Sequence, residues 1–172
     1  MINTLYSYDF DNTLIQTPEP ELGKKIWLEK TGTEWPYKGW WSKSESLDIN
    51  IFEMNKNEWV YGKYLESISQ ENSYNIMATG RLDKIPNMRK NVEKILNKYN
   101  LSFDEIHLNN LGDTFDFKIR LFEDLMKKTK CNHFVMYDDR QEHIIEFNKW
   151  ARNHKNSITV VDVINRTSET HN

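Results

Sequence analysis

The residues of this chain best suited to chemistry are two aspartates two positions apart, in the segment Asp9-Phe10-Asp11-Asn12-Thr13-Leu14. The segment follows an N-terminal apolar run. In an extended strand alternate side chains share a face, so both carboxylates are expected to point the same way. One carboxylate can attack phosphorus while the second handles the proton of the leaving group. The same residues also suit a strand that runs into an Asx turn, so the segment alone leaves both interpretations open.

Three later segments also combine an apolar stretch with polar side chains. Residues 75–78 lead to Thr79-Gly80-Arg81, and residues 133–137 lead to Asp138-Asp139-Arg140. Between them, the sequence Thr-Phe-Asp-Phe-Lys at 114–118 opens an amphipathic stretch. These segments supply the hydroxyl, carboxylate and ammonium groups that bind a phosphate ester or a metal ion.

Strand-like and helix-like segments alternate along most of the chain. Strand-like runs are expected at residues 5–9, 74–78, 105–108, 133–137 and 157–163, with apolar stripes of helical period between the later runs. This alternation predicts an α/β fold with a doubly wound, Rossmann-like parallel sheet. Such sheets bind ligands beyond the carboxyl ends of their strands, where Asp9, Thr79 and Asp138 are therefore expected to meet.

The order Asp-x-Asp-x-Thr, Thr-Gly, a single Lys and Asp-Asp resembles the four signature motifs of the haloacid dehalogenase (HAD) superfamily of phosphohydrolases, from about residue 5 to residue 145. Shorter stretches look like the HAD domain of the "Swiss Army Knife RNA repair-like" proteins: Thr17-Pro18-Glu19-Pro20, Gly39-Trp40-Trp41, residues 114–118 and residues 137–140. The resemblance implies a HAD-type fold with a small cap inserted after the first strand. It also implies a phosphatase that depends on Mg²⁺ and forms an aspartyl-phosphate.

The resemblance assigns a role to each motif residue. Asp9 would attack phosphorus, Asp11 would act as general acid and then general base, and Lys118 would stabilise the transferring group. Four residues would be catalytic: Asp9, Asp11, Thr79 and Lys118. Four would hold Mg²⁺, with Asp11 using its main-chain carbonyl and Asp139 acting directly or through water: Asp9, Asp11, Asp138 and Asp139. Five would bind the substrate: Thr79, Gly80, Arg81, Lys118 and Arg140.

Several motif residues also suit ordinary structural roles. Thr79-Gly80 can form a strand-end turn. Asp138-Asp139 can cap the following helix, which contributes about 1 kcal/mol to helix stability. Lys84 and Lys90 compete with Lys118 for the role of the motif lysine, although the residues around Lys118 favour it.

The remaining cationic and histidine side chains have two interpretations each. Arg81 and Arg140 can bind a second phosphate or a carboxylate through a planar fork. They can equally form structural ion pairs, for which the candidate partners are Asp83, Asp139 and Glu142. His143 is expected on the surface, and His107 is expected to be structural.

Residues 1–172 are expected to form one HAD-like domain, with residues 15–73 as a small cap insertion and residues 165–172 as a C-terminal tail. The insertion holds three of the four prolines and five of the six tryptophans. Its aromatic residues can stack on bases or nucleosides, or they can form the insertion's own core. The residues concerned are Trp27, Trp35, Trp40 and Trp41.

Composition limits the partners of the protein. A net charge of −3 argues against a broad basic surface for duplex nucleic acid, although a short local groove is compatible with it. Cys131 is the single cysteine, so no disulfide framework is expected. With no signal peptide and no long apolar run, the expectation is an intracellular protein, cytoplasmic or nuclear, without membrane contact. The sequence leaves the oligomeric state open.

Three functional classes compete. The leading hypothesis is a phosphatase that removes a terminal phosphate from an RNA or DNA end. The alternative is a small-molecule phosphatase for nucleotides or sugar phosphates, which the acidic composition favours. A phosphate-binding module without activity predicts a damaged motif, and none of the four motifs is damaged. A dehalogenase proper is disfavoured by the aspartate pair and the Asp-Asp motif.

Overall fold

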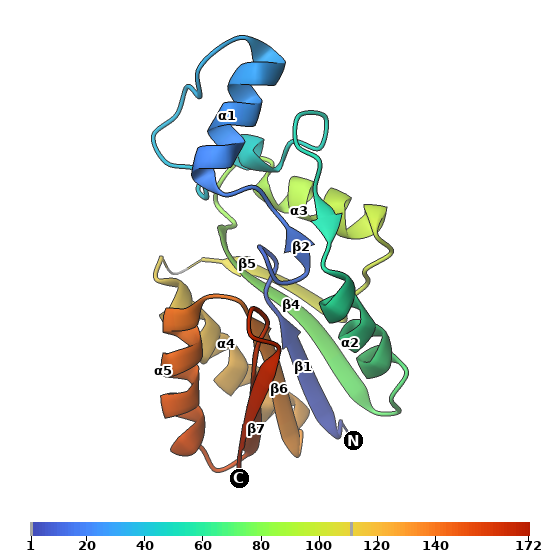
Figure 1. Cartoon of the computed structure of the whole chain (residues 1–172). Coiled ribbons are helices and arrows are strands. Elements are labelled where there is room, and N and C mark those ends of the chain that lie inside the picture. Colours follow the sequence, from blue (N-terminus) through green and yellow to red (C-terminus); the bar gives the residue numbers. More distant parts are fainter. Residues whose placement is uncertain (1, 111) are drawn as a thin grey trace.

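The computed structural model describes residues 2–110 and 112–172, which form one six-stranded sheet and a two-stranded pair (Figure 1). The order in the large sheet is β5-β4-β1-β6-β7-β8, and neighbouring strands are parallel except β7 and β8. The predicted α/β fold with a mainly parallel sheet is therefore confirmed. The strands of the large sheet are β1 Thr4–Tyr8, β4 Ser73–Leu82, β5 Glu105–Asn109, β6 His133–Asp138, β7 Ser157–Asp162 and β8 Thr167–His171.

Helices cover both faces of the sheet, as a doubly wound fold requires. One face carries α2 and α3, and the other carries α4 and α5 (Figure 1). Alternate residues of β1 enter the two cores: Leu5 belongs to the α4–α5 core, whereas Tyr6 and Tyr8 belong to the α2–α3 core. No helix in the described part of the chain is long and apolar enough to cross a membrane. The helices are α2 Glu58–Ile68, α3 Met88–Lys98, α4 Thr114–Thr129 and α5 Gln141–Arg152.

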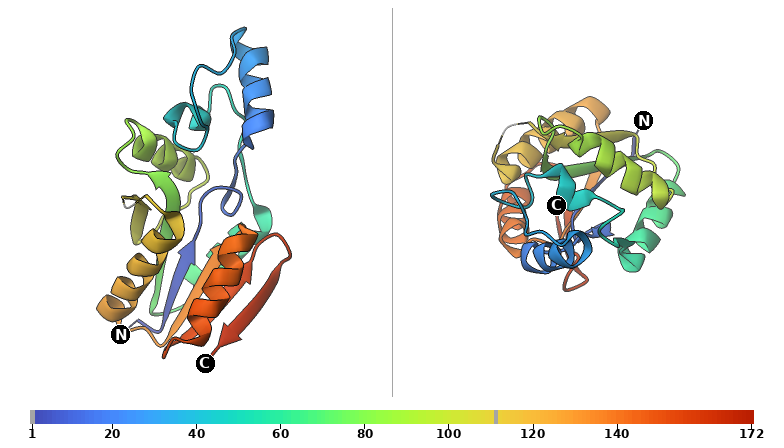
Figure 2. Two further views of the ribbon diagram at one scale, coloured as in Figure 1. Left: turned by 90° about the vertical axis from the view of Figure 1, so that its left-hand side faces the viewer. Right: turned by 90° about the horizontal axis from the view of Figure 1, so that it is seen from above.

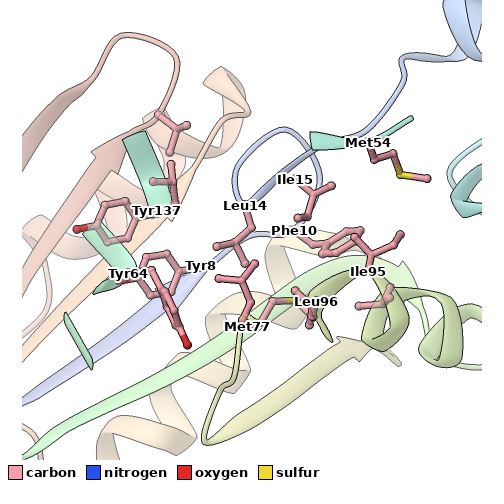
Figure 3. Close-up of a cluster of buried hydrophobic side chains, with 14 of the residues drawn as sticks. Tyr8, Phe10, Leu14, Ile15, Met54, Tyr64, Met77, Ile95, Leu96 and Tyr137 are labelled. Carbon is pink, nitrogen blue, oxygen red and sulfur yellow. The ribbon is translucent and has the colours of Figure 1, made fainter. Parts of the chain in front are cut away.

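The α2–α3 core continues past the end of β1 and anchors the loop that follows it (Figure 3). Tyr8 stacks on Tyr137 of β6 with ring centroids 4.7 Å apart, and its hydroxyl donates to Ser67 of α2 at 2.9 Å. Phe10 and Leu14 are fully buried in the same core. Burial of such side chains stabilises by about 1.5–3 kcal/mol each. The loop between them, which carries the second aspartate of the first motif, is therefore fixed from both ends.

The chain between β1 and α2 extends beyond the carboxyl ends of the strands, at the top of Figure 1. Figure 2 shows its long helix at the end of the molecule opposite both termini. The last helix of the predicted cap segment, α2, packs instead against β4 on the sheet. The protruding part therefore comprises about residues 15–57. Its elements are β2 Ile15–Gln16, α1 Pro20–Thr31, the short 3₁₀ helix η1 Ser44–Leu47 and β3 Asn55–Lys56.

Three tryptophans of this insertion pack on one another. Trp35 contacts Trp27 and Trp40 with ring centroids 5.0 and 4.6 Å away, respectively. Trp40 is buried, and its indole N–H donates to the carbonyl of Pro18 at 2.9 Å. A short segment needs large rings to bury enough apolar surface, and these tryptophans supply it in a cluster that is continuous with the α2–α3 core. Trp41 lies outside the cluster and faces the site described below.

The segment that the sequence predicts as a tail, residues 165–172, contains β8. This strand pairs antiparallel with β7, from Asp162 with Thr167 to Ile158 with His171. Its sequence Thr-Ser-Glu-Thr-His has no apolar alternation, and its side chains are mostly exposed. Hydrophobic periodicity is the main sequence signal for a strand, so this polar edge strand gave none.

Candidate active site

Polar side chains from β1 and β6 meet at the carboxyl edge of the sheet. Asp9 follows β1 directly, and its amide donates to the carbonyl of Tyr137 at 3.0 Å. Asp138 is the last residue of the neighbouring β6. The chain after Asp9 turns through Asn12, whose φ of 53° lies in the left-handed region that asparagine tolerates. The amide of Asn12 then donates to the carbonyl of Ile15 at 2.7 Å, which closes the turn.

A buried lysine joins the two strand-end carboxylates. The ammonium nitrogen of Lys118 donates to Asp9 Oδ1 at 2.8 Å and to Asp138 Oδ2 at 2.6 Å. Lys118 lies in α4, whose first turn is capped by Asp113, which accepts from the amide of Asp116 at 2.9 Å. The residue is 2% exposed, so α4 delivers a cation from a dry environment to the sheet edge. Ionised partners make such hydrogen bonds short and strong.

The carboxyl groups around this lysine have unequal pKa values. Burial raises the pKa of Asp9 to about 6, against the lowering effect of Lys118 and with a further raise from Asp138. Burial and the charges of Asp9 and Asp138 raise the pKa of Asp139 to about 7. Burial also acts on Asp138, but the ammonium of Lys118 and the nearby imidazole of His143 hold its pKa well below the usual range. Lys118 is therefore one cation among three carboxyl groups, and it offsets only part of their charge when all three are ionised.

Three carboxylates are arranged to hold a metal ion. Asp9, Asp138 and Asp139 each offer one oxygen, and these oxygens lie within 4.8 Å of one another. Hard oxygen donors are the ligands that Mg²⁺ prefers, and Mg²⁺ usually keeps several waters beside one or two carboxylates. Burial and mutual repulsion raise the pKa values of Asp9 and Asp139, and a divalent ion bound between the three carboxylates would stabilise their ionised forms. The residues present therefore fit the Mg²⁺ that the motifs imply.

Asp11 lines the same cavity as Asp9 but forms its ion pair with Arg81. The guanidinium Nε donates to Asp11 Oδ2 at 2.9 Å and Nη2 donates to Asp11 Oδ1 at 2.7 Å. Asp83, an expected partner of Arg81, pairs instead with Arg89 at 3.0 Å. Arg81 is 2% exposed. Its fork is thus occupied within the protein, which disfavours the expected contact with substrate.

The two residues of the second motif, Thr79 and Gly80, lie in different surroundings. Thr79 is fully buried, and its hydroxyl oxygen accepts from the amide of Arg81 at 3.2 Å. Gly80 lines the cavity. A Cβ at Gly80 would lie 2.7 Å from Oγ1 of Thr114, so glycine allows the start of α4 to approach the sheet edge.

A cavity of about 390 Å³ lies over this edge. All the predicted site residues line it except Thr79 and Asp138, which are fully buried. Thr114 also lines it, one turn before Lys118 on α4, and this i, i+4 spacing is a signal that the sequence contained. Four further residues line the cavity that were not predicted as site residues, although Trp41 was among the rings expected either to stack on a base or to form the core of the insertion: Asn12, Glu19, Trp41 and His143.

Arg140 and His143 form one wall of the cavity at the start of α5. Nη1 of Arg140 lies 3.4 Å from Nε2 of His143, and no ion pair joins Arg140 to a carboxylate within residues 2–110 and 112–172. His143 was expected on the surface, but its ring packs against Phe115 and Phe147 and its Nδ1 lies 3.9 Å from Asp138 Oδ2. His143 belongs to the first turn of α5, and its side chain points inward over the sheet edge.

Comparisons with known proteins concern the family and the fold of the chain. The family model described as HAD domain family 1 in Swiss Army Knife RNA repair proteins matches residues 19–172. No curated protein matches the sequence. Among solved structures, a haloacid dehalogenase-like family hydrolase from Streptococcus pneumoniae is similar, with a TM-score of 0.50 over 94% of this chain and 84% of that chain. The two sequences are 11% identical, so this likeness shows the fold alone.

Proposed function

Because the chain belongs to HAD domain family 1 of the Swiss Army Knife RNA repair proteins, we propose that it is a Mg²⁺-dependent phosphatase that removes a terminal phosphate from a nucleic acid end. The observation that carries this proposal is the position of Lys118 between Asp9 and Asp138, with Asp139 beside them. The family match begins at residue 19, so the role of Asp9 and Asp11 rests on this geometry and on their motif.

In the proposed first step, a carboxylate oxygen of Asp9 forms a bond to phosphorus while the bond from phosphorus to the leaving oxygen breaks. Asp11 gives its proton to that oxygen, which departs as an alcohol. Lys118 lies 2.8 Å from Asp9 Oδ1, so its charge offsets the approach of an anionic nucleophile to an anionic phosphate. The products of the step are an aspartyl-phosphate and an ionised Asp11.

In the second step a water molecule attacks the phosphorus of the aspartyl-phosphate. Asp11 takes the proton from this water, and the bond between phosphorus and the Asp9 oxygen breaks. Inorganic phosphate leaves, and both aspartates return to their starting states. Bound Mg²⁺ would neutralise phosphoryl charge next to the carboxylates of Asp9, Asp138 and Asp139.

Three features of the cavity favour a nucleic acid end as the substrate. The insertion above the sheet edge is small, and a small insertion leaves more room for the end of a polymer than a large one would. Trp41 lines the cavity and offers a ring on which a terminal base can stack. Arg140 lines the cavity and has no carboxylate partner in the described chain, so its guanidinium is available for a second phosphate.

A small-molecule phosphatase is the second candidate, and the charge of the cavity favours it. Asp9, Asp11, Glu19 and Asp139 line the cavity, whereas the charges of Arg81 and Lys118 are paired with carboxylates. The net charge of −3 adds no long-range attraction for a polyanion. A compact nucleotide or sugar phosphate needs fewer cationic contacts than a strand does.

The test is phosphate release from a matched panel in the presence of Mg²⁺: RNA and DNA oligonucleotides with 3′- or 5′-phosphates, mononucleotides and sugar phosphates. We expect the highest kcat/KM for one class of oligonucleotide end, and a steep loss of kcat/KM with added salt. Asp9→Asn should abolish release with the fold intact, while Asp124→Asn, an exposed aspartate of α4, should not change it. A preference for mononucleotides or sugar phosphates with a flat salt response would contradict the substrate assignment.

A further inference from the structure

Arg81 is a buried cation whose hydrogen bonds are directed into the protein. Besides its two bonds to Asp11, its Nη1 donates to the carbonyl of Trp41 at 3.0 Å and to Ser46 Oγ at 2.7 Å. The guanidinium carbon also lies 5.0 Å from the centre of the Trp41 ring. A guanidinium has five N–H donors in a rigid fork, so these contacts leave little capacity for a ligand.

Asp11 is held on both carboxylate oxygens. Oδ1 accepts from Arg81 Nη2 at 2.7 Å and from the hydroxyl of Thr17 at 2.8 Å, and Oδ2 accepts from Arg81 Nε at 2.9 Å. A two-point contact with a planar fork fixes the plane of the carboxylate as well as its position. The buried Phe10 and Leu14 fix the backbone of the loop around Asp11, and the fork of Arg81 fixes the orientation of the carboxylate itself.

The opposite end of the guanidinium contacts the insertion. Ser46 is fully buried in η1, and its hydroxyl donates to the carbonyl of Lys43 at 2.7 Å. The carbonyl of the neighbouring Ser44 accepts from Asn91 of α3 at 2.9 Å, which ties η1 to the sheet domain. Arg81 thus connects a fixed part of the insertion with the second aspartate of the first motif.

We propose that Arg81 is a positioning residue, which orients the Asp11 carboxylate toward the leaving-group oxygen and couples this orientation to the insertion through Trp41 and Ser46. The proposal rests on the proposed phosphatase function. Arg81 does not bind the substrate, so its loss acts on proton transfer and leaves substrate affinity nearly unchanged.

This role has a kinetic signature that a merely structural role lacks. A positioned acid matters when the leaving oxygen is a poor leaving group, as in the phosphate of a ribose or glycerol hydroxyl. It matters little for p-nitrophenyl phosphate, whose phenolate leaves without a proton. General acid–base catalysis typically contributes about 10²–10⁴-fold in rate, so misplacement of Asp11 should cost roughly 100-fold with the poor leaving group.

The experiment compares kcat and KM of wild type and Arg81→Lys with p-nitrophenyl phosphate and with β-glycerophosphate or a 3′-phosphate oligonucleotide. Arg81→Lys keeps the charge and removes the fork. We expect kcat to fall roughly 100-fold with the poor leaving groups and only a few-fold with p-nitrophenyl phosphate, at unchanged KM. The matched control is Arg89→Lys, since Arg89 also holds an aspartate through Nε and Nη2, at 3.0 and 3.1 Å, but on the surface and away from the cavity.

Ser46→Ala provides a second route, because it removes one contact of Arg81 and leaves the cavity lining intact. Its kcat should fall several-fold with the poor leaving groups and remain nearly unchanged with p-nitrophenyl phosphate. If Arg81→Lys fails to fold, Ser46→Ala is the variant that tests the role of Arg81. An equal loss with both substrate classes, an increase confined to KM, or unchanged kinetics would overturn the role of Arg81. Wild type that releases phosphate from neither class would instead overturn the proposed function and this role with it.

Discussion

Replacement of Lys118 by methionine tests the charge balance of the site. Methionine preserves most of the volume of the buried stem, so the cavity left behind is small. The change removes the cation that contacts Asp9 at 2.8 Å and Asp138 at 2.6 Å. Removal of one partner from a buried ion pair leaves an uncompensated charge and typically costs about 3–5 kcal/mol. At roughly 2–4 °C per kcal/mol in a chain of this size, we expect Tm to fall by about 6–20 °C.

The assay is urea denaturation of the metal-free protein at pH 8, followed by the same titration with Mg²⁺. Mg²⁺ should stabilise Lys118→Met more than wild type, because the ion replaces part of the lost positive charge. The control is Lys149→Met on the surface of α5, whose ion pair with Glu146 is worth at most about 0.5 kcal/mol. If Lys118→Met lowers the free energy of unfolding by less than about 1 kcal/mol, the reasoning is refuted, because surface ion pairs contribute in that range.

Further expectations concern the pH dependence of Mg²⁺ binding, the packing of the insertion and the reactivity of the Cys131 thiol. The pKa values of Asp9 and Asp139 are raised to about 6 and about 7, respectively. In their protonated forms these two groups therefore contribute to the stability of the metal-free protein at low pH. That contribution is lost as the pH rises through 6 and 7. Mg²⁺ binds the ionised forms, and the increase in Tm that it causes should therefore grow from pH 5 to pH 8; an equal increase at both pH values would contradict the metal assignment. Gly23→Ala places a Cβ 2.2 Å from the Trp40 ring, so it should destabilise the insertion by about 1–3 kcal/mol, which tryptophan fluorescence during urea unfolding would detect. Burial raises the pKa of the Cys131 thiol, so a thiol reagent should label it far more slowly in the native protein than in urea, and equal rates would contradict its burial.

Much of the site could be predicted because chemistry and topology point to the same places. Apolar runs that end in polar residues mark the carboxyl ends of parallel strands, which share one edge of the sheet. The choice of Lys118 over its competitors followed from the residues around it. The structure places its ammonium against Asp9, whereas Lys84 and Lys90 line a separate hollow near α3.

Other features could not be predicted because their partners are distant in sequence or their pattern is weak. The Arg81–Asp11 pair joins residues 70 positions apart, and local sequence around Arg81 pointed to Asp83 instead. The inward turn of His143 depends on packing against Phe115, which belongs to another helix. Long-range packing of this kind leaves no trace in periodicity, which reports only which face of an element is buried.

The central claim, nucleophilic attack by Asp9, is tested most directly by acid quenching of a single turnover with substrate carrying a ³²P-labelled phosphate. The account predicts a transient label on the protein that alkali releases and that maps to the peptide containing Asp9. The label should be absent in Asp9→Asn, while Asp124→Asn should be labelled like wild type. Phosphate release without any labelled protein, or full activity in Asp9→Asn, would contradict the account.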